Sequence, residues 1–397
     1  MKRHWKALLG FGLSGFLIWF TLRGVDLVQV WQEVRVANPY LLASSILVIL
    51  AGYLFRAARW RVLLHPVDPN TGFGNRLKAV VIGFAITNLI PARVGEFARA
   101  YTLGRLEPRV SVSAAFGSLV VERVMDGLVL GGFLVAAVFS PGFPEVTPGS
   151  GLAGVLRGAM SLIGILLAVL MGFLFAPGPV IAAVNWVGRF LPKGAGRLLN
   201  DVLAAFLDSL DVVRSPVLLL LGFGWTLAFW LFHGLSFHLA MLAFGIDEGF
   251  VAALFTEAVV GFGVALPAAP GFFGTFHVSA QFALERVYGA DPAATLAFAY
   301  GYHIGGFIPI TLIGLWLIRS VGFSMSEMAH SEEAVEEAVE ASTAGAKPAE
   351  GRPTGAGGPV EETGETSTRT ESPAEGRHGQ GAGGPAPDDP RGTGGPA

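Results

Sequence analysis

Long apolar runs fill the first 320 positions of the chain, and a polar sequence follows them. A helix that crosses a bilayer needs about 20 consecutive, mostly apolar residues. The pattern therefore predicts an all-α fold, a polytopic helical membrane protein. The runs of sufficient length are residues 5–22, 40–64, 113–140, 152–175, 216–244 and 292–318.

Two further apolar runs are interrupted by proline and glycine. Residues 79–90 end at Pro91, and residues 250–266 end at a Pro/Gly segment that begins with Pro267. Apolar runs this short are typical of re-entrant or buried segments. We expect six spans and two re-entrant hairpins, and eight full spans are the alternative.

Lysine and arginine in short loops favour the cytoplasmic side of a membrane. With two hairpins, the N-terminus, residues 56–109, residues 189–214 and Arg319 all lie inside, and these segments hold most of the basic residues. A full crossing by residues 79–104 would move Arg109 outside and weaken this bias. We therefore expect a multi-pass protein of the plasma or inner membrane with both termini in the cytoplasm.

The two interrupted segments share the motif Pro-Ala-x-x-Gly, at Pro91 to Gly95 and at Pro267 to Gly271. Each copy follows an apolar run and precedes a long helix, and three predicted spans separate them, so the second copy is inverted. Paired Pro/Gly interruptions in two halves indicate a transporter's midplane site. Half-helix N-termini meeting there would attract an anion, phosphate above all. The alternative is that these residues simply kink two transmembrane helices.

Charged residues gather at the first interruption and in the apolar run that follows it. Ionisable groups inside a membrane are costly to insert and mark functional sites. Here arginines and acids balance, which equally fits an ion network that only holds helices together. In the functional interpretation, arginines bind a lipid phosphate and the acids position them. These residues are Arg93, Glu96, Arg99, Glu122, Arg123 and Asp126.

Three motifs, in this order, resemble the signatures of the lysylphosphatidylglycerol synthase transmembrane-region family, also called flippase-like domain proteins. The resemblance spans residues 5–320 and implies an integral inner-membrane domain that handles lipids. Members include the flippase half of the multiple peptide resistance factor and proteins implicated in hopanoid or glycolipid traffic. The motifs are Asn88-Leu-Ile-Pro-x-Arg-x-Gly-Glu-x-x-Arg99, Glu122-Arg-x-x-Asp126 and Leu266-Pro-x-x-Pro-Gly-x-x-Gly274.

The second half of the chain departs from the family pattern. His277 stands where relatives tend to have glutamate, and Phe272-Phe273 replace a glycine-rich pair. Of the histidines, we single out His277 and His303. The full candidate substrate-binding set is Asn88, Pro91, Arg93, Gly95, Glu96, Arg99, Glu122, Arg123, Asp126, Pro267, Pro270, Gly271, Gly274, His277 and His303.

Residues 323–397 form an acidic, Gly/Pro-rich segment after the predicted transmembrane domain 1–322, and from about Ala341 they show no apolar periodicity. Such a composition predicts a disordered cytoplasmic tail, apart from a possible short helix around residues 332–340. In full-length synthases, lysyl transfer resides in a soluble C-terminal domain in this position. The resemblance therefore implies that synthase activity is absent.

Composition narrows the class of function further. The chain is 52% hydrophobic and 14% charged, unlike soluble domains, and it has no cysteine for a thiolate metal site. No histidine or carboxylate spacing suggests a metal, so we expect no cofactor and no nucleic-acid partner. We expect a lipid translocase, not an enzyme, whose partners are membrane lipids with an anionic, polyprenyl or glycolipid headgroup. The alternatives are an intramembrane lipid-modifying enzyme and a non-transporting membrane scaffold.

Overall fold

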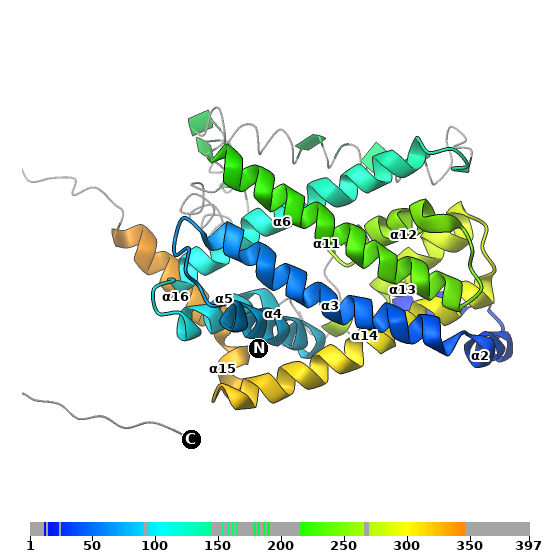
Figure 1. The fold of residues 1–397 in the computed structure, drawn as a ribbon, viewed down its shortest axis with the longest axis horizontal. Coiled ribbons are helices and arrows are strands. Elements are labelled where there is room, and N and C mark those ends of the chain that lie inside the picture. The colour runs from blue at the N-terminus through cyan, green and yellow to red at the C-terminus, as the bar shows by residue number, and fades with distance from the viewer. Residues whose placement is uncertain are drawn as a thin grey trace, which may run out of the picture. The chain divides into compact units, whose positions relative to one another are not determined.

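A computed structural model describes residues 15–23, 25–90, 94–144, 215–265 and 270–345, with short pieces elsewhere before residue 191. These residues form helices joined by turns and contain no strand, which confirms the predicted all-α class for the described part (Figure 1). The chain divides into two units, residues 1–347 and 348–397, and the description concerns the first.

Four long helices correspond to four of the predicted spans. Three of them begin with proline directly after a side chain that caps the helix, as Asn38 does by accepting from the N–H groups of Tyr40 and Leu41. These three, α3, α11 and α14, are long and apolar enough to cross a membrane. The four are α3 (Pro39–Leu64), α6 (Val112–Val138), α11 (Pro216–Ala243) and α14 (Pro292–Ser320).

The first interrupted segment folds as a hairpin of α4 (Phe73–Leu89) and α5 (Val94–Leu106). Its open end is closed by Glu107, whose Oε1 accepts from the Gly72 N–H at 2.8 Å, so the chain returns to the end from which it started. The two helices approach closely at Gly83 and Gly95. A Cβ on Gly83 would lie 2.8 Å from the Gly95 carbonyl oxygen, and therefore only glycine allows this contact.

The second interrupted segment also doubles back, and its turn requires unusual backbone. Gly271 has φ +65°, which glycine adopts freely, and Phe272 has φ +60°, which is uncommon for a residue with a side chain. The segment consists of α12 (Gly249–Gly263), the short 3₁₀ turn η1 (Pro270–Phe272), α13 (Thr275–Gln281) and the π-helical η2 (Phe282–Val287).

The packing of these elements follows one scheme in both halves. Helices α3 and α11 run side by side at the centre (Figure 1). The first hairpin packs α4 against α14 and α5 against α6, and the second packs α12 against α6 and α13 against α14. Exchanging α3 with α11, α4 with α12, α5 with α13 and α6 with α14 reproduces each of these contacts.

Two shorter helices follow α14, and a third precedes α3. Val335 and Val339, one turn apart, are buried against α5 and α6, so residues beyond 322 pack on the helices before them, and the helix predicted around residues 332–340 is present. The reason is the apolar face that valine and alanine create at helical spacing in an otherwise acidic segment. The helices are α15 (Met325–Ala329), α16 (Ser331–Gly345) and, near the N-terminus, α2 (Leu27–Val36).

Candidate functional site: an ion network between two hairpins

Helix α6 places two carboxylates one turn apart in the interior. Glu122 is fully buried and Asp126 is 4% exposed. Arginines from three helices surround them, and Glu96 joins at the edge, 3.8 Å from Arg123. We call this set the ion network: Arg56 and Arg59 on α3, Glu96 and Arg99 on α5, and Glu122, Arg123 and Asp126 on α6.

Glu122 is the centre of the ion network. Arg99 donates to it through two nitrogens, Nη1 to Oε1 at 2.8 Å and Nη2 to Oε2 at 3.0 Å. Arg59 Nη2 lies 2.9 Å from Oε1, and Arg123 Nη2 donates to the same oxygen at 2.8 Å. One carboxylate therefore joins α3, α5 and α6.

Asp126 connects the same group to α11. Arg59 Nη1 donates to its Oδ1 at 2.5 Å, and the indole Nε1 of Trp230 donates to that oxygen at 2.9 Å. Arg59 Nη1 also donates to Thr226 Oγ1 at 3.2 Å. Because Arg59 is wholly buried with two carboxylate partners, its role is to hold the helices together.

Arg56 is held differently. Its nearest described carboxylate oxygen, Glu122 Oε1, is 3.5 Å from Nη1, a long contact for an ion pair. Its guanidinium instead lies over aromatic rings, 4.2 Å from the Phe229 centroid and 4.9 Å from the Phe84 centroid. The aromatic rings cover the faces of the planar guanidinium. Its N–H groups point outward in that plane and remain able to donate to a ligand.

A cavity of about 380 Å³ adjoins the ion network, and we call it the charged cavity. Both hairpins border it: Thr87 and Gly95 come from the first, and Ala265 and Phe272 from the second. Five charged residues also line it, namely Arg56, Glu96, Arg99, Arg123 and Asp126.

A second cavity of about 180 Å³, the aromatic cavity, lies next to it. Its walls include the rings of Tyr53, Phe237, Phe276 and Tyr302, and its polar lining includes Glu257. The two cavities share five lining residues, so the charged and the aromatic cavity lie side by side. The shared residues are Phe84, Trp230, Gly261, Val264 and Phe272.

Comparison with known protein families identifies the family of this chain. The model of one protein family, described as the lysylphosphatidylglycerol synthase TM region, matches residues 7–314. The chain belongs to this family. It is a multi-pass membrane protein, and the resemblance inferred from its motifs is confirmed.

Two curated proteins are similar at a distance. The glycosyltransferase AglD of Haloferax volcanii is 25% identical over 340 residues, which cover 80% of this chain but 53% of AglD. A UPF0104 membrane protein of Methanothermobacter thermautotrophicus is 24% identical over 347 residues, covering 82% of this chain and 98% of that protein. No solved structure matches the chain.

The first-half candidates gather as one site in this family member. Gly95, Glu96, Arg99, Arg123 and Asp126 line the charged cavity, and Glu122 lies at the centre of the ion network. Asn88 lines the neighbouring aromatic cavity, where its amide donates to Thr311 Oγ1 at 2.9 Å. Pro91 and Arg93 lie outside the described residues.

The second-half candidates lie in the opposite turn and behind it. Pro270, Gly271 and Gly274 shape the turn, and the Gly274 N–H donates to His277 Nδ1 at 3.3 Å. His303 lines the aromatic cavity, whereas His277 is fully buried and its ring stacks on that of Tyr300, with the centroids 3.9 Å apart. Pro267 lies outside the described residues.

The sequence interpretation missed four residues of this interior. Arg56 and Arg59 lie in the last third of the apolar run 40–64 and were assigned to the cytoplasmic side. The signal that could have found them is their three-residue spacing, which puts both on one helix face, apart from the exposed Arg61. His233 and Glu257 form a 2.6 Å contact across α11 and α12, which no spacing within either segment indicates. Because Arg56 and Arg59 join it, the ion network has four arginines and three carboxylates among the described residues, whereas the sequence count of three and three included Arg93, which lies outside them. Within the described chain, no three His, Asp or Glu side chains form a group that could hold a metal ion.

Proposed function

We propose that the protein is a lipid translocase that moves an anionic or glycosylated headgroup through the charged cavity. The observation that carries this proposal is the excess of arginine over carboxylate in the ion network, beside a cavity that both hairpins border. A cavity with spare cationic donors at membrane depth binds anions, and guanidinium groups match the geometry of phosphate.

The cavity's size and lining fit a headgroup. Binding pockets for small molecules occupy roughly 300–1,000 Å³, so about 380 Å³ accommodates a phosphate with its substituent. Arg56 and Arg123 have donors facing the cavity and contact the phosphate in this proposal. Arg99 lines the same wall, while its ion pair with Glu122 holds α5 in place.

The two hairpins act as inverted repeats in this proposal. The support is the packing scheme, in which exchanging the first set of helices for the second reproduces each contact. Two related halves around a central site suit alternating access, because each half can open the site to one side. We place the open ends of α4 and α5 at the cytoplasmic face and the α11–α12 connection outside.

An intramembrane lipid-modifying enzyme is the second candidate. It is favoured by the buried Glu257–His233 pair, a potential acid and base, and by the distant relative that is named a glycosyltransferase. This chain spans about half of that relative, so the relative's activity is not carried over. An enzyme changes the mass of its lipid, whereas a translocase changes only the leaflet.

The test uses proteoliposomes that contain fluorescent nitrobenzoxadiazole-phosphatidylglycerol, with dithionite added outside to quench the accessible probe. Wild type should move probe from the inner leaflet, and Arg56→Gln should slow this by about tenfold, the loss of one charge-assisted contact. Arg61→Gln, an exposed arginine on the same helix, is the matched control and should match wild type. Equal quenching in protein-free vesicles would contradict transport of this headgroup, and a probe of altered mass would favour the enzyme.

A further inference from the structure

The aromatic cavity contains a buried carboxylate that the proposed headgroup site does not use. Glu257 on α12 is 1% exposed, and its Oε1 lies 2.6 Å from Nδ1 of His233 on α11. Its other oxygen, Oε2, has no hydrogen-bond partner among the described residues. A lone buried carboxylate is unfavourable, and a short contact with an imidazole provides for one shared proton.

The pair lies beside the ion network. On α11, Phe229, Trp230 and His233 form one surface, and the His233 ring centroid lies 5.7 Å from each of the other two ring centroids. Arg56 covers the same surface, 4.2 Å above Phe229 and 5.7 Å above Trp230. The cation of Arg56 and the ring of His233 therefore lie on the same aromatic surface, close enough for the charge of Arg56 to act on the pair.

Several other titratable groups face the pair from the surrounding helices. Asp126 is already paired with Arg59 at 2.5 Å, so its charge is compensated. Arg56, with its long contact to Glu122, is the cation whose field remains available to the pair. The other groups are Tyr53 on α3 and Tyr302 and His303 on α14, which line the same cavity, and behind them His277 on α13, whose ring contacts that of His303.

We propose that Glu257 and His233 form a proton-binding site, coupled through Arg56 to anion binding in the charged cavity. This inference rests on the proposed function. The positive charge of Arg56 favours the deprotonated pair, and an anion bound at Arg56 neutralises that charge, so the pair takes up a proton as the anion binds. Linkage is reciprocal, and protonation therefore raises anion affinity by the same factor. A phosphate-bearing headgroup then moves together with a proton, which couples lipid movement to the proton gradient.

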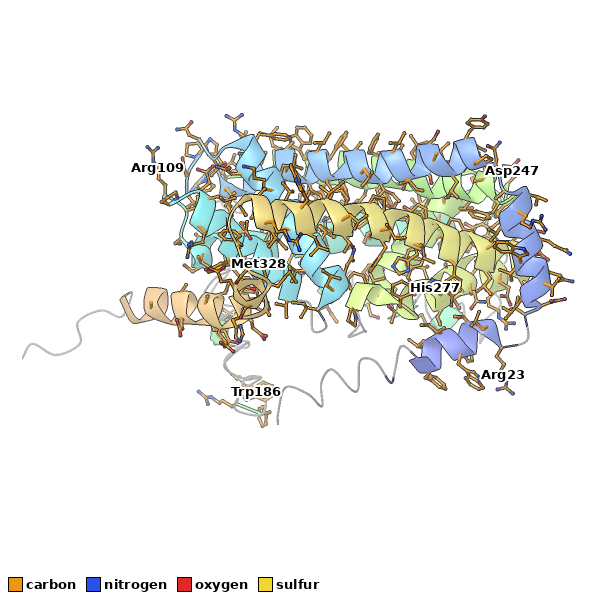
Figure 2. All side chains as sticks on the ribbon, turned by 90° about the horizontal axis from the view of Figure 1, so that it is seen from below. Arg23, Arg109, Trp186, Asp247, His277 and Met328 are labelled. Carbon is orange, nitrogen blue, oxygen red and sulfur yellow. The ribbon has the colours of Figure 1, made fainter. Side chains whose placement is uncertain are left out.

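The experiment measures proton uptake during lipid binding to the full chain in detergent. Soluble dihexanoyl-phosphatidylglycerol is titrated by calorimetry between about pH 6 and 8, in buffers of different ionisation enthalpy. Wild type should take up as much as one proton per lipid bound, and its affinity should fall by up to about tenfold per pH unit above the titration of the pair. Glu257→Gln should abolish both the uptake and the pH dependence. Asp247→Asn, at an exposed position before α12 (Figure 2), should keep both.

The outcomes separate this inference from the function on which it rests. Wild-type binding without proton uptake overturns the coupling and leaves the lipid site intact; this result needs no variant. Full uptake in Glu257→Gln and in the second variant, His233→Gln, overturns the assignment to this pair. If wild type binds no lipid at any pH, the proposed headgroup site itself is wrong, and the coupling falls with it.

Discussion

Arg99 and Glu122 form a two-point ion pair across α5 and α6, with N–O distances of 2.8 and 3.0 Å. The Arg99 guanidinium also lies 4.0 Å from the ring centroid of Trp60 on α3. One side chain thus holds the second limb of the first hairpin against two long helices. Any movement of this hairpin relative to the bundle must break or exchange these contacts, so the ion pair is suited to setting the hairpin's position.

We expect Arg99→Lys to destabilise the protein, although charge is conserved. Lysine offers a point charge and cannot make both hydrogen bonds to Glu122 or stack flat on Trp60. Breaking a buried pair outright costs about 3–5 kcal/mol, and lysine should lose part of this. The thermal midpoint, followed by size-exclusion fluorescence, should fall by several degrees, while Arg105→Lys at the exposed end of α5 should leave it unchanged. An unchanged midpoint in Arg99→Lys would mean that the two-point pair contributes little.

Arg56 and Arg59, one turn apart on α3, should separate binding from folding. Arg59→Gln removes the guanidinium that lies 2.5 Å from Asp126 and 2.9 Å from Glu122, so we expect poor folding or a loss of several degrees in midpoint. Arg56→Gln removes one long ion contact and the stacking on Phe229 and Phe84. It should therefore lose less stability than Arg59→Gln, but about tenfold in dihexanoyl-phosphatidylglycerol affinity. Equal effects of the two variants on both measurements would contradict their separate roles.

The fold could largely be predicted, because apolar runs and prolines within short stretches of sequence determine where its helices begin and end. The apolar runs at 40–64, 113–140, 216–244 and 292–318 gave the four long helices, and the prolines gave the two places where helices stop short. The sequence indicated a short helix around residues 332–340, but not that Val335 and Val339 pack it on α5 and α6, because acidic neighbours obscure this narrow apolar face. A short amphipathic helix shows from its sequence that it has an apolar face, but not which surface that face packs against.

The site could be predicted only in part, because half of it arises from contacts between helices. Glu122, Asp126 and Arg99 stand out as charges within apolar or interrupted segments. Arg56, in contrast, lies near the end of the apolar run 40–64, where basic residues ordinarily mark the cytoplasmic side. Only the packing of α3 against α11 shows that it turns inward over Phe229. His233 needs α12 beside it before Glu257 becomes a partner.

We expect Gly95→Ala to disrupt the first hairpin. A Cβ at this position would overlap Thr87 Oγ1 and the carbonyl oxygen of Gly83, and the carbonyl cannot rotate away. The yield of monodisperse protein and the thermal midpoint should both fall. The matched control is Gly132→Ala on α6, whose Cβ would meet open space and should stabilise the helix slightly. Normal behaviour of Gly95→Ala would show that α4 and α5 separate easily.

Removal of α16 should destabilise the bundle, whereas removal of the second unit should not. Truncation after Lys347 leaves the first unit whole, but truncation after Ala329 exposes the surfaces of α5 and α6 that Val335 and Val339 cover. The finer variant is Val335→Asp, which buries a charge and should lower the thermal midpoint by several degrees. Glu337→Gln, at an exposed position of the same helix, serves as its control. Equal midpoints for Val335→Asp and wild type would show that α16 contributes nothing to the bundle.

The hairpin arrangement predicts which side of the membrane each connection faces. Arg109 follows α5 and Asp247 precedes α12, at opposite ends of the long helices (Figure 2). The native chain has no cysteine, so Arg109→Cys and Asp247→Cys each provide one label site. A membrane-impermeant maleimide added to intact cells should label the second variant only, because α5 returns to the end where α4 begins. External labelling of Arg109→Cys would instead require the first hairpin to cross the bilayer, and the eight-span arrangement would then replace the re-entrant one.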